Sequence, residues 1–280
     1  MTKNYIDKFT FLSLVIIALV VFSCDRVPPN PPKPTPKPTP QPTESPPIVT
    51  PSVMEEVYAP TLFFDSGEKD PLTTVEAFMQ VGPTLQGRKG IKRYKIIKEK
   101  PTLEDLAQNT SKKVKIDGDE YELMLQTKAQ VSRYEGVVYT RKLQKNDFTY
   151  IQYWFFYSFN DTSSLGGNAI TRKCGNHQAD WEHISLKINT AKFEAAKDDE
   201  GYLKAIEELY FSQHGKGQND ERKFRKTKDK EVHFEGTHVK AYPARGSHAT
   251  YYEPHKGPGY LLIKTLGLYD HADGKGIALK

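Results

Sequence analysis

A proline-rich stretch divides the chain into parts that must fold differently. Residues 28–51 are dominated by proline, as in Pro34-Thr35-Pro36-Lys37-Pro38. Proline has a fixed φ and no backbone N–H, so this stretch can form neither a helix nor a central strand and favours extended polyproline II. It would span roughly 70 Å at about 3.1 Å per residue. We therefore predict a stalk over residues 24–51 and one packed domain over residues 52–280. The alternative is a proline-rich ligand for a partner domain.

The N-terminus has the pattern of a secretory signal. Lys3 and Lys8 precede an apolar run from Phe9 to Phe22. A short basic segment followed by an apolar core is typical of a signal peptide, and this run is too short for a comfortable membrane span. We predict a signal peptide over residues 1–23. The alternative is an uncleaved anchor.

The end of that run, Val21-Phe22-Ser23-Cys24, resembles a bacterial lipobox. The resemblance implies cleavage before Cys24 and attachment of lipid, including palmitate, to this residue. It also implies a protein anchored to a membrane of the bacterial cell envelope, either periplasmic or surface-exposed. The chain has two cysteines, so a lipidated Cys24 leaves Cys174 without a partner and no disulfide is expected.

The domain is predicted to be mainly β. Thr149–Tyr157 is rich in aromatic and β-branched residues, which indicates a buried strand. Apolar and polar residues alternate over 184–188, which also indicates a strand. Further strands are expected at Tyr58–Phe64, Glu208–His214 and Thr237–Tyr242. Many strands with long excursions predict an antiparallel β-sandwich with helical insertions and long loops.

Two helices are expected between these strands. Asp70 is a candidate N-cap, with Pro71 in the first turn and Val75, Phe78 and Met79 on one face. A surface helix is expected within Phe193–Leu209. The two tryptophans, Trp154 and Trp181, are expected to pack in the core.

The charge of the chain argues against nucleic-acid binding. The net charge is +5, and loss of Lys3, Lys8 and Asp7 with the signal peptide lowers it to +4. This value is small for the length of the chain. The basic run at 222–226 is interleaved with acidic residues and is expected to be a solvated loop.

The segment 175–183, Gly-Asn-His-Gln-Ala-Asp-Trp-Glu-His, carries the chemistry of the chain. In a strand, Asp180 and Glu182 point to the same face because side chains alternate with period two. Adjacent carboxylates repel unless a cation or a proton lies between them. The imidazole of His177 can approach both carboxylates from the preceding loop. The segment therefore predicts a small cation site. The alternative is that Asp180 is a turn residue and Glu182 is a paired surface charge.

Other polar residues mark predicted strand ends. Asp161 follows the aromatic strand, His214 ends a strand, and His248 directly follows another. Each histidine alone is more commonly structural or exposed. Their shared position at strand-to-loop junctions predicts convergence on one edge of the sandwich.

Four blocks of the chain resemble the vacuolar protein sorting-associated protein 62 family. Their order and spacing agree with the family over most of residues 56–255, and the segment 212–215 also fits. The family name does not define a reaction. The blocks are Tyr58-Ala59-Pro60 with Phe64 and Glu68, Tyr153-Trp154-Phe155-Phe156-Tyr157, the segment 175–183, and Gly246-Ser247-His248-Ala249 with Tyr251.

The segment 175–183 is also similar to the central motif of the necrosis- and ethylene-inducing peptide-like toxins, secreted β-sandwich proteins that bind sphingolipid head groups. These toxins hold a divalent cation with an aspartate after an aromatic strand and a His-x-x-Asp-Trp-Glu segment. The resemblance implicates Asp161, His177, Asp180 and Glu182 as metal ligands. The toxin motif begins Gly-His-Arg-His, whereas this chain lacks the second histidine. That difference puts cytolysis in doubt more than the cation site.

The ligand types suggest the metal. Oxygen ligands from Asp161, Asp180 and Glu182 favour Ca²⁺ or Mg²⁺, whereas several histidines would allow Zn²⁺ or Mn²⁺. His177 is either a ligand or a residue that orients ligands. His183 alternates to the face opposite Glu182, so it is assigned at most an orienting role.

Three functions are consistent with these residues. The first is a membrane-anchored lipoprotein whose divalent-cation site binds a polar lipid head group or a glycan. The second is a metal-dependent hydrolase in which His214 or His248 acts as general base or acid. The third is a structural envelope lipoprotein whose motif stabilises the fold. We favour binding over catalysis, and the sequence leaves open whether the protein is an enzyme.

Overall fold

The structure is a computed structural model that describes residues 53–70, 72–89, 93–108, 113–127, 131, 136–161, 176–213, 224–257 and 270–279. The predicted signal peptide, Cys24, the stalk, Cys174 and His214 lie outside these residues. Within the described ranges, no helix is both long and apolar enough to span a membrane.

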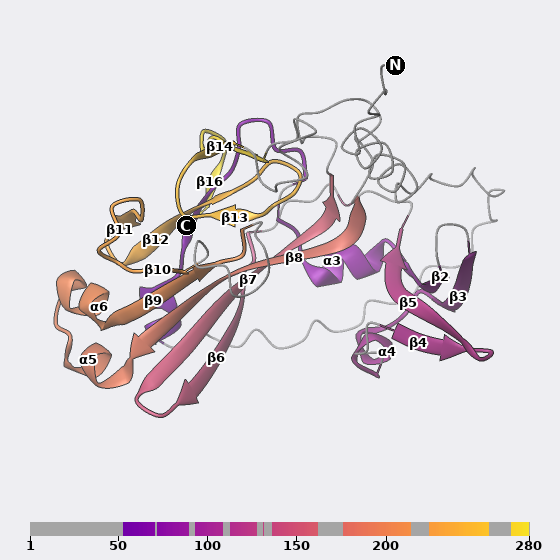
Figure 1. Cartoon of the computed structure of the whole chain (residues 1–280), viewed down its shortest axis with the longest axis horizontal. Coiled ribbons are helices and arrows are strands. Elements are labelled where there is room, and N and C mark those ends of the chain that lie inside the picture. Colours follow the sequence, from indigo (N-terminus) through magenta and orange to yellow (C-terminus); the bar gives the residue numbers. More distant parts are fainter. Residues whose placement is uncertain are drawn as a thin grey trace, which may run out of the picture.

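A five-stranded antiparallel sheet, here called the main sheet, forms the centre of the molecule (Figure 1). Its two longest strands pair along their whole length, from Phe148 opposite Asn189 to Asn160 opposite His177. The strand order is β10-β9-β8-β7-β6, with bounds β6 Tyr139–Lys145, β7 Phe148–Asn160, β8 His177–Asn189, β9 Ile206–Phe211 and β10 Phe224–Arg225.

A second sheet faces the main sheet. Its order is β11-β12-β1-β16, and β13 also pairs with β12. The pairing of β1 with β12 is parallel and places Thr61 opposite Lys240, whereas the other pairs in this sheet are antiparallel. The bounds are β1 Thr61–Phe63, β11 Phe234–Glu235, β12 His238–Pro243, β13 Thr250–Tyr251 and β16 Ala278–Leu279.

The core lies between these two sheets, which confirms the predicted mainly β sandwich. Alternate residues of β7 and β8 point into the core, because side chains in a strand alternate between faces. The short helix α2, Val53–Val57, and the following Tyr58 pack against the same core. The principal core residues are Tyr58, Leu62, Phe64, Ile151, Tyr153, Phe155, Tyr157, Ile184, Leu186, Ile188, Leu209, Phe211, Val239 and Ala241.

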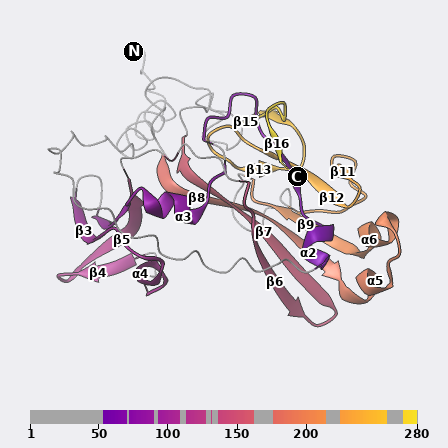
Figure 2. The ribbon, with the colours of Figure 1, turned by 180° about the vertical axis from the view of Figure 1, so that it is seen from behind.

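A separate four-stranded sheet lies beside the N-terminal end of β8, as seen from both sides in Figures 1 and 2. Phe156 packs there against Phe78 of helix α3, with Leu125 of the small sheet close by. The strand order is β3-β2-β5-β4, with bounds β2 Thr84–Lys89, β3 Arg93–Glu99, β4 Lys113–Ile116 and β5 Asp119–Gln126. Helix α4 spans Leu103–Gln108. A separate two-stranded sheet is formed by β14 His255–Gly257 and β15 Asp270–Ala272.

The helices differ from the sequence predictions at their ends. Helix α3 spans Val75–Gln80, and its N-cap is Thr74, whose side chain accepts a hydrogen bond from the amide of Ala77, so the assignment of Asp70 as the cap was wrong. The helix expected within Phe193–Leu209 is two short helices, α5 Thr190–Ala195 and α6 Asp199–Ala205, each capped by its own polar residue. Strand β9 then begins at Ile206.

The expectation that both tryptophans pack in the core was also wrong. Trp154 and Trp181 lie on the face of the main sheet that points away from the second sheet, and Trp181 is 40% exposed. The reason is strand alternation: Asp180 and Glu182 point inward, so Trp181 between them points outward.

Replacement of a residue that faces the core should show how much the sandwich depends on this packing. Leu186→Ala removes a 1% exposed side chain opposite Ile151 and should lower the free energy of unfolding by about 2–5 kcal/mol, because a cavity remains. Leu143→Ala, at a 44% exposed position of β6, should change it by less than about 0.5 kcal/mol. Urea unfolding of both variants measures the difference; equal losses would contradict the assignment of the core face.

Candidate functional site

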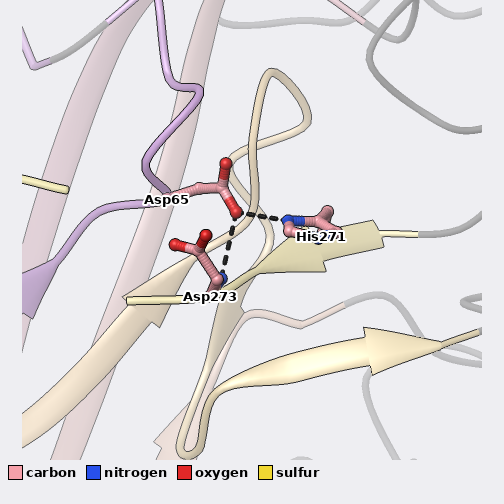
Figure 3. Close-up of side chains that lie close together, drawn as sticks. All are labelled: Asp65, His271 and Asp273. Atoms are coloured by element: carbon pink, nitrogen blue, oxygen red, sulfur yellow. Dashed lines mark hydrogen bonds and ion pairs between the residues drawn. The ribbon is translucent and has the colours of Figure 1, made fainter. Parts of the chain in front are cut away.

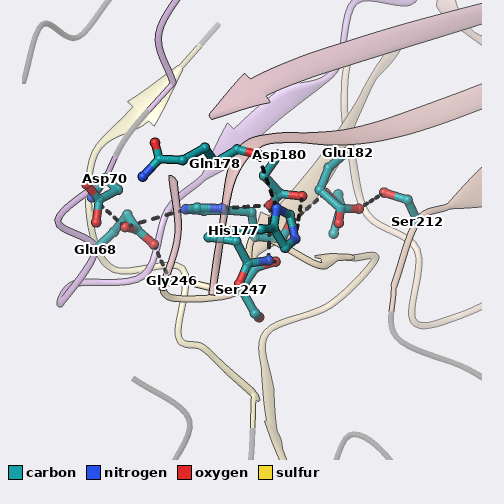
Figure 4. Close-up of polar contacts among 12 residues, drawn as sticks. Glu68, Asp70, His177, Gln178, Asp180, Glu182, Ser212, Gly246 and Ser247 are labelled. Carbon is teal, nitrogen blue, oxygen red and sulfur yellow. Dashed lines mark hydrogen bonds and ion pairs between the residues drawn. The ribbon is translucent and has the colours of Figure 1, made fainter. Parts of the chain in front are cut away.

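A polar cluster lies where β7 ends, β8 begins and the chain turns after β12 (Figure 4). Asp180 comes from β8 and Asn160 from the end of β7. His248 comes from the turn between β12 and β13, and Glu68 comes from the loop after β1. These four residues are far apart in the sequence, and the pairing of the strands brings them together.

His248 is the centre of this cluster and is fully buried. Its ring stacks on Tyr157, with 3.8 Å between centroids and 4° between planes. Nδ1 lies 3.0 Å from Asp180 Oδ2, and Nε2 lies 3.8 Å from Glu68 Oε1. The backbone of His248 has a positive φ of 54°, a region that non-glycine residues rarely occupy and that is often found at functional positions.

The surroundings of His248 favour its charged form. Burial opposes a charge, but the hydrogen bond to Asp180 and the contact with Glu68 outweigh burial and raise the pKa of His248 to about 9. Burial also opposes the charge on Glu68, yet the contacts with His248 and nearby amides hold the pKa of Glu68 below its ordinary value. At neutral pH the cluster therefore contains an imidazolium held between two carboxylates.

Backbone hydrogen bonds fix the turn that carries His248. Glu68 Oε1 accepts hydrogen bonds from the amides of Lys69 and Asp70, both at 2.7 Å, and Oε2 accepts from the amide of Gly246 at 2.8 Å. The amide of Asp161 donates to the carbonyl of Gly246 at 2.7 Å. Gly246 has a φ of 70°, which glycine adopts without strain. The loop after β1 and the end of β7 thus hold this turn from two sides.

Asn160 and His177 lie beside Asp180 at the edge of the cluster, and Asp161 follows Asn160 in the chain; we call Asn160, Asp161, His177 and Asp180 the rim. His177 Nε2 lies 3.9 Å from Asp180 Oδ1, and the His177 side chain is 47% exposed. Asn160 donates from Nδ2 to Asp180 Oδ2 and to the carbonyl of Ser247, both at 3.4 Å. Asp161 accepts a hydrogen bond from Asn176 at 3.3 Å.

The local backbone explains how His177 reaches Asp180. In a regular strand these two residues, three positions apart, would point to opposite faces. Ala179 between them has a φ of 58°, in the left-handed region. An L-residue adopts this conformation at a cost of about 1–2 kcal/mol, so the surrounding structure must impose it. The resulting bend accompanies the approach of His177 to Asp180.

A buried acceptor in the rim has no donor. Asn160 Oδ1 is buried and has no hydrogen-bond partner among the described residues. The opposite orientation of this amide would place the oxygen against Asp180 and the Ser247 carbonyl, which are both acceptors. Buried polar oxygens are normally satisfied, so this atom needs a donor or a cation.

Two further predicted residues, Glu182 and His183, lie on opposite faces of β8, and Figure 4 draws Glu182 close to Asp180. Glu182 faces inward as expected, and its carboxylate accepts a hydrogen bond from the hydroxyl of Ser212 after β9. His183 is on the outer face, where Nδ1 lies 3.0 Å from Ser185 Oγ and the ring packs 4.3 Å from Trp154. The ligand role of Glu182 and the orienting role of His183 stay predictions.

A second cluster was missed by the sequence reasoning (Figure 3). Asp65, His271 and Asp273, here called the clasp, are the one set of three potential ligand atoms within 4.8 Å of one another in the described part of the chain. His271 Nδ1 lies 2.5 Å from Asp65 Oδ2, which also accepts from the amide of Asp273 at 3.0 Å. No sequence motif connects residues more than 200 positions apart.

The clasp already satisfies its own carboxylates. Asp65 Oδ1 accepts from the amide of Gly67, and Asp273 accepts from the amides of Ser66 and Lys275 and from the Ser66 hydroxyl. Burial opposes the charge on Asp273, but the hydrogen bonds from Ser66 and Lys275 lower its pKa to about 2. These contacts describe a junction that joins the loop after β1 to the loop after β15.

Comparison with known proteins gave one match. The family described as vacuolar protein sorting-associated protein 62 matches residues 45–263. Comparisons with curated proteins and with solved structures gave no match. The similarity to the necrosis- and ethylene-inducing peptide-like toxins therefore remains a prediction from the motif.

The charge on His248 predicts a specific pH dependence. The folded protein keeps a proton up to about pH 9, whereas the unfolded chain releases it near pH 6.5. The stabilisation is therefore complete below about pH 6.5 and is lost as the pH rises through about 9, with a slope of about 1.4 kcal/mol per pH unit. Urea unfolding across this interval measures the slope.

His248→Asn is the matched variant, because asparagine tolerates a positive φ but carries no charge. It leaves two buried carboxylates without their cation and should cost about 3–5 kcal/mol near neutral pH. Its stability should not show the slope of the wild type. A wild-type stability that stays constant from about pH 6.5 to about pH 9 would contradict the imidazolium assignment.

Proposed function

The chain belongs to the vacuolar protein sorting-associated protein 62 family, and we propose that its β-sandwich binds a divalent cation at the rim. The cation then holds a polar ligand, either a lipid head group or a glycan. The observation that carries the proposal is the unpaired buried oxygen of Asn160, which lies beside Asp180 and near the exposed His177.

The rim supplies suitable ligand atoms. Asp180 Oδ1 faces His177 Nε2, while Oδ2 is used by His248, so the carboxylate can serve both partners at once. Asn160 Oδ1 adds a neutral oxygen, and Asp161 follows it directly in the chain. Oxygen ligands favour Ca²⁺ or Mg²⁺, and a single imidazole also allows Mn²⁺ or Zn²⁺. Because the His177 side chain is exposed, a cation held beside it would keep positions open for phosphate or sugar oxygens.

The position of His248 favours binding over catalysis. A general base must reach the proton that it removes, directly or through a water molecule. The His248 ring is fully buried, stacked on Tyr157 and directed toward two carboxylates. We therefore assign His248 the role of an internal cation that balances Asp180 and Glu68. The hydrolase alternative then depends on His214.

The N-terminal segment completes the proposal. Cleavage before Cys24 and lipid attachment would anchor the protein to a membrane of the bacterial cell envelope, and the proline-rich stalk would hold the sandwich away from that surface. The rim would then meet its ligand at a distance from the anchor. A purely structural lipoprotein remains the alternative in which the cluster stabilises the fold without a ligand.

Metal binding tests the proposal directly. His177→Ala should weaken divalent-cation binding by at least about tenfold. It should leave the free energy of unfolding within about 0.5 kcal/mol of wild type, because the side chain is exposed. Titration calorimetry with Ca²⁺, Mg²⁺, Mn²⁺ and Zn²⁺, with metal analysis of the purified protein, measures the first quantity. His233→Ala, at another exposed histidine, is the control.

The clasp provides a second control. If His271→Ala abolished metal binding while His177→Ala did not, the cation would lie at the clasp and the rim assignment would be wrong. If no metal bound to the wild type, the structural alternative would be favoured.

Asp180→Ala should behave differently from His177→Ala. It removes the closer carboxylate from a buried imidazolium and should cost about 3–5 kcal/mol of stability with or without metal. Thermal and urea unfolding in the presence of a chelator measures this loss. An Asp180→Ala variant that is as stable as wild type without metal would contradict the charge balance proposed for the cluster.

A further inference from the structure

A continuous row of aromatic rings crosses the outer face of the main sheet, and we call it the aromatic ladder. Each of the five strands contributes at least one ring. Its members are Tyr139 on β6, Trp154 on β7, Trp181 and His183 on β8, Tyr210 on β9 and Phe224 on β10.

Each ring contacts the next. Trp181 lies 5.3 Å from Tyr139 and 6.3 Å from Trp154, measured between centroids. His183 lies 4.3 Å from Trp154 and stacks on Tyr210 at 5.0 Å, and Tyr210 lies 5.1 Å from Phe224. Four inter-strand spacings of about 4.8 Å give the ladder a width of about 19 Å.

Helix α3 covers the outer face of the main sheet next to the ladder, and the ladder itself is accessible. Phe156, the residue opposite Trp181, is buried under Phe78 of helix α3. Trp181 next to it is 40% exposed, and the other rings of the ladder are partly exposed. Aromatic side chains of this size are usually buried, so a connected row that is partly exposed indicates a contact surface.

Uncharged polar groups run beside the rings on the same face. Gln152 donates from Nε2 to Ser185 Oγ at 3.4 Å, and Ser185 Oγ also lies 3.0 Å from His183 Nδ1. Gln152 Oε1 has no hydrogen-bond partner among the described residues. The surface thus combines apolar rings with amide, hydroxyl and imidazole groups that can pair with hydroxyls.

We propose that the aromatic ladder binds an oligosaccharide chain, with a sugar ring packed against Trp181 and its hydroxyls directed to the Gln152–Ser185 line. Sugar rings present C–H faces that pack on the negative face of an aromatic ring, and their hydroxyls require the polar groups that specify orientation. The width of the ladder matches an extended chain of several sugars better than a single sugar.

Charged side chains flank the aromatic ladder on the same face. Lys187 lies opposite Glu208 across β8 and β9, and its ammonium also lies 4.2 Å from the centre of the Phe148 ring. Arg141, opposite Gln152, and Lys145, opposite Phe148, add basic charge to this face. The sugar contact proposed here therefore rests on the rings and on the Gln152–Ser185 line, not on the charge of the face. The ladder is also independent of the rim, because Trp181 and Asp180 point to opposite faces of β8.

Tryptophan fluorescence can report on this surface without a label. Trp154 and Trp181 are the two tryptophans of the chain, and both belong to the ladder. We would titrate the full chain, at constant detergent, with hexasaccharides of cellulose, chitin, xylan and mannan at up to millimolar concentration. At least one should produce a saturable change in emission, and its disaccharide should bind more weakly.

Trp181→Ala should weaken that binding by at least about tenfold, whereas Leu143→Ala, exposed on the same face outside the ladder, should bind like wild type. Calorimetry measures both affinities, and far-ultraviolet circular dichroism checks folding. His177→Ala and a chelator should leave binding unchanged, so failure of the cation proposal would be seen separately. The inference is overturned if no hexasaccharide binds, if Trp181→Ala binds like wild type, or if lipid vesicles alone change the emission.

Discussion

A buried imidazolium between two carboxylates organises one end of this β-sandwich. His248 is fully enclosed, yet its contacts with Asp180 and Glu68 raise its pKa to about 9. A buried charge without a partner costs several kcal/mol, so the three residues depend on one another. Each comes from a different segment, and the loop after β1, the hairpin β7–β8 and the turn after β12 must all be in place before the charges balance. Asp180 uses Oδ2 for His248, so its Oδ1 remains on the side of His177, where the proposed cation binds.

This arrangement gives His248, considered from the sequence as a general base or acid, a role inside the cluster that differs from that of the residues predicted to bind a cation. His248 stabilises the cluster from inside, whereas Asn160 and His177 lie beside Asp180 at its edge and Asp161 follows Asn160 in the chain. The two faces of β8 also differ: the inward Asp180 and Glu182 carry carboxylates, and the outward Trp181 and His183 belong to the aromatic ladder. A protein built in this way could hold a polar group through a cation at the rim and a sugar chain on the outer face without either ligand crossing the core.

The sequence predicted the strands that dominate the sandwich because their patterns are local. The aromatic run at Thr149–Tyr157 and the alternation after Asp180 correspond to β7 and β8, and the shared face of Asp180 and Glu182 follows from the same alternation. That alternation also places Trp181 outward, so its assignment to the core contradicted the pattern already in use. The role of Glu68 could not be predicted, because it depends on the parallel pairing of β1 with β12. The approach of His177 to Asp180 likewise accompanies the left-handed backbone of Ala179, which alanine gives no reason to expect.

The most direct test of a cation at the rim is a crystal structure of the purified protein grown with Mn²⁺, with anomalous differences recorded to locate the ion. A cation at the rim predicts one anomalous peak within coordination distance of Asp180 Oδ1 and His177 Nε2, with Asn160 Oδ1 turned toward it and His248 still paired with Glu68. A peak at Asp65, His271 and Asp273 instead, or a rim that holds no ion at saturating Mn²⁺, would contradict it.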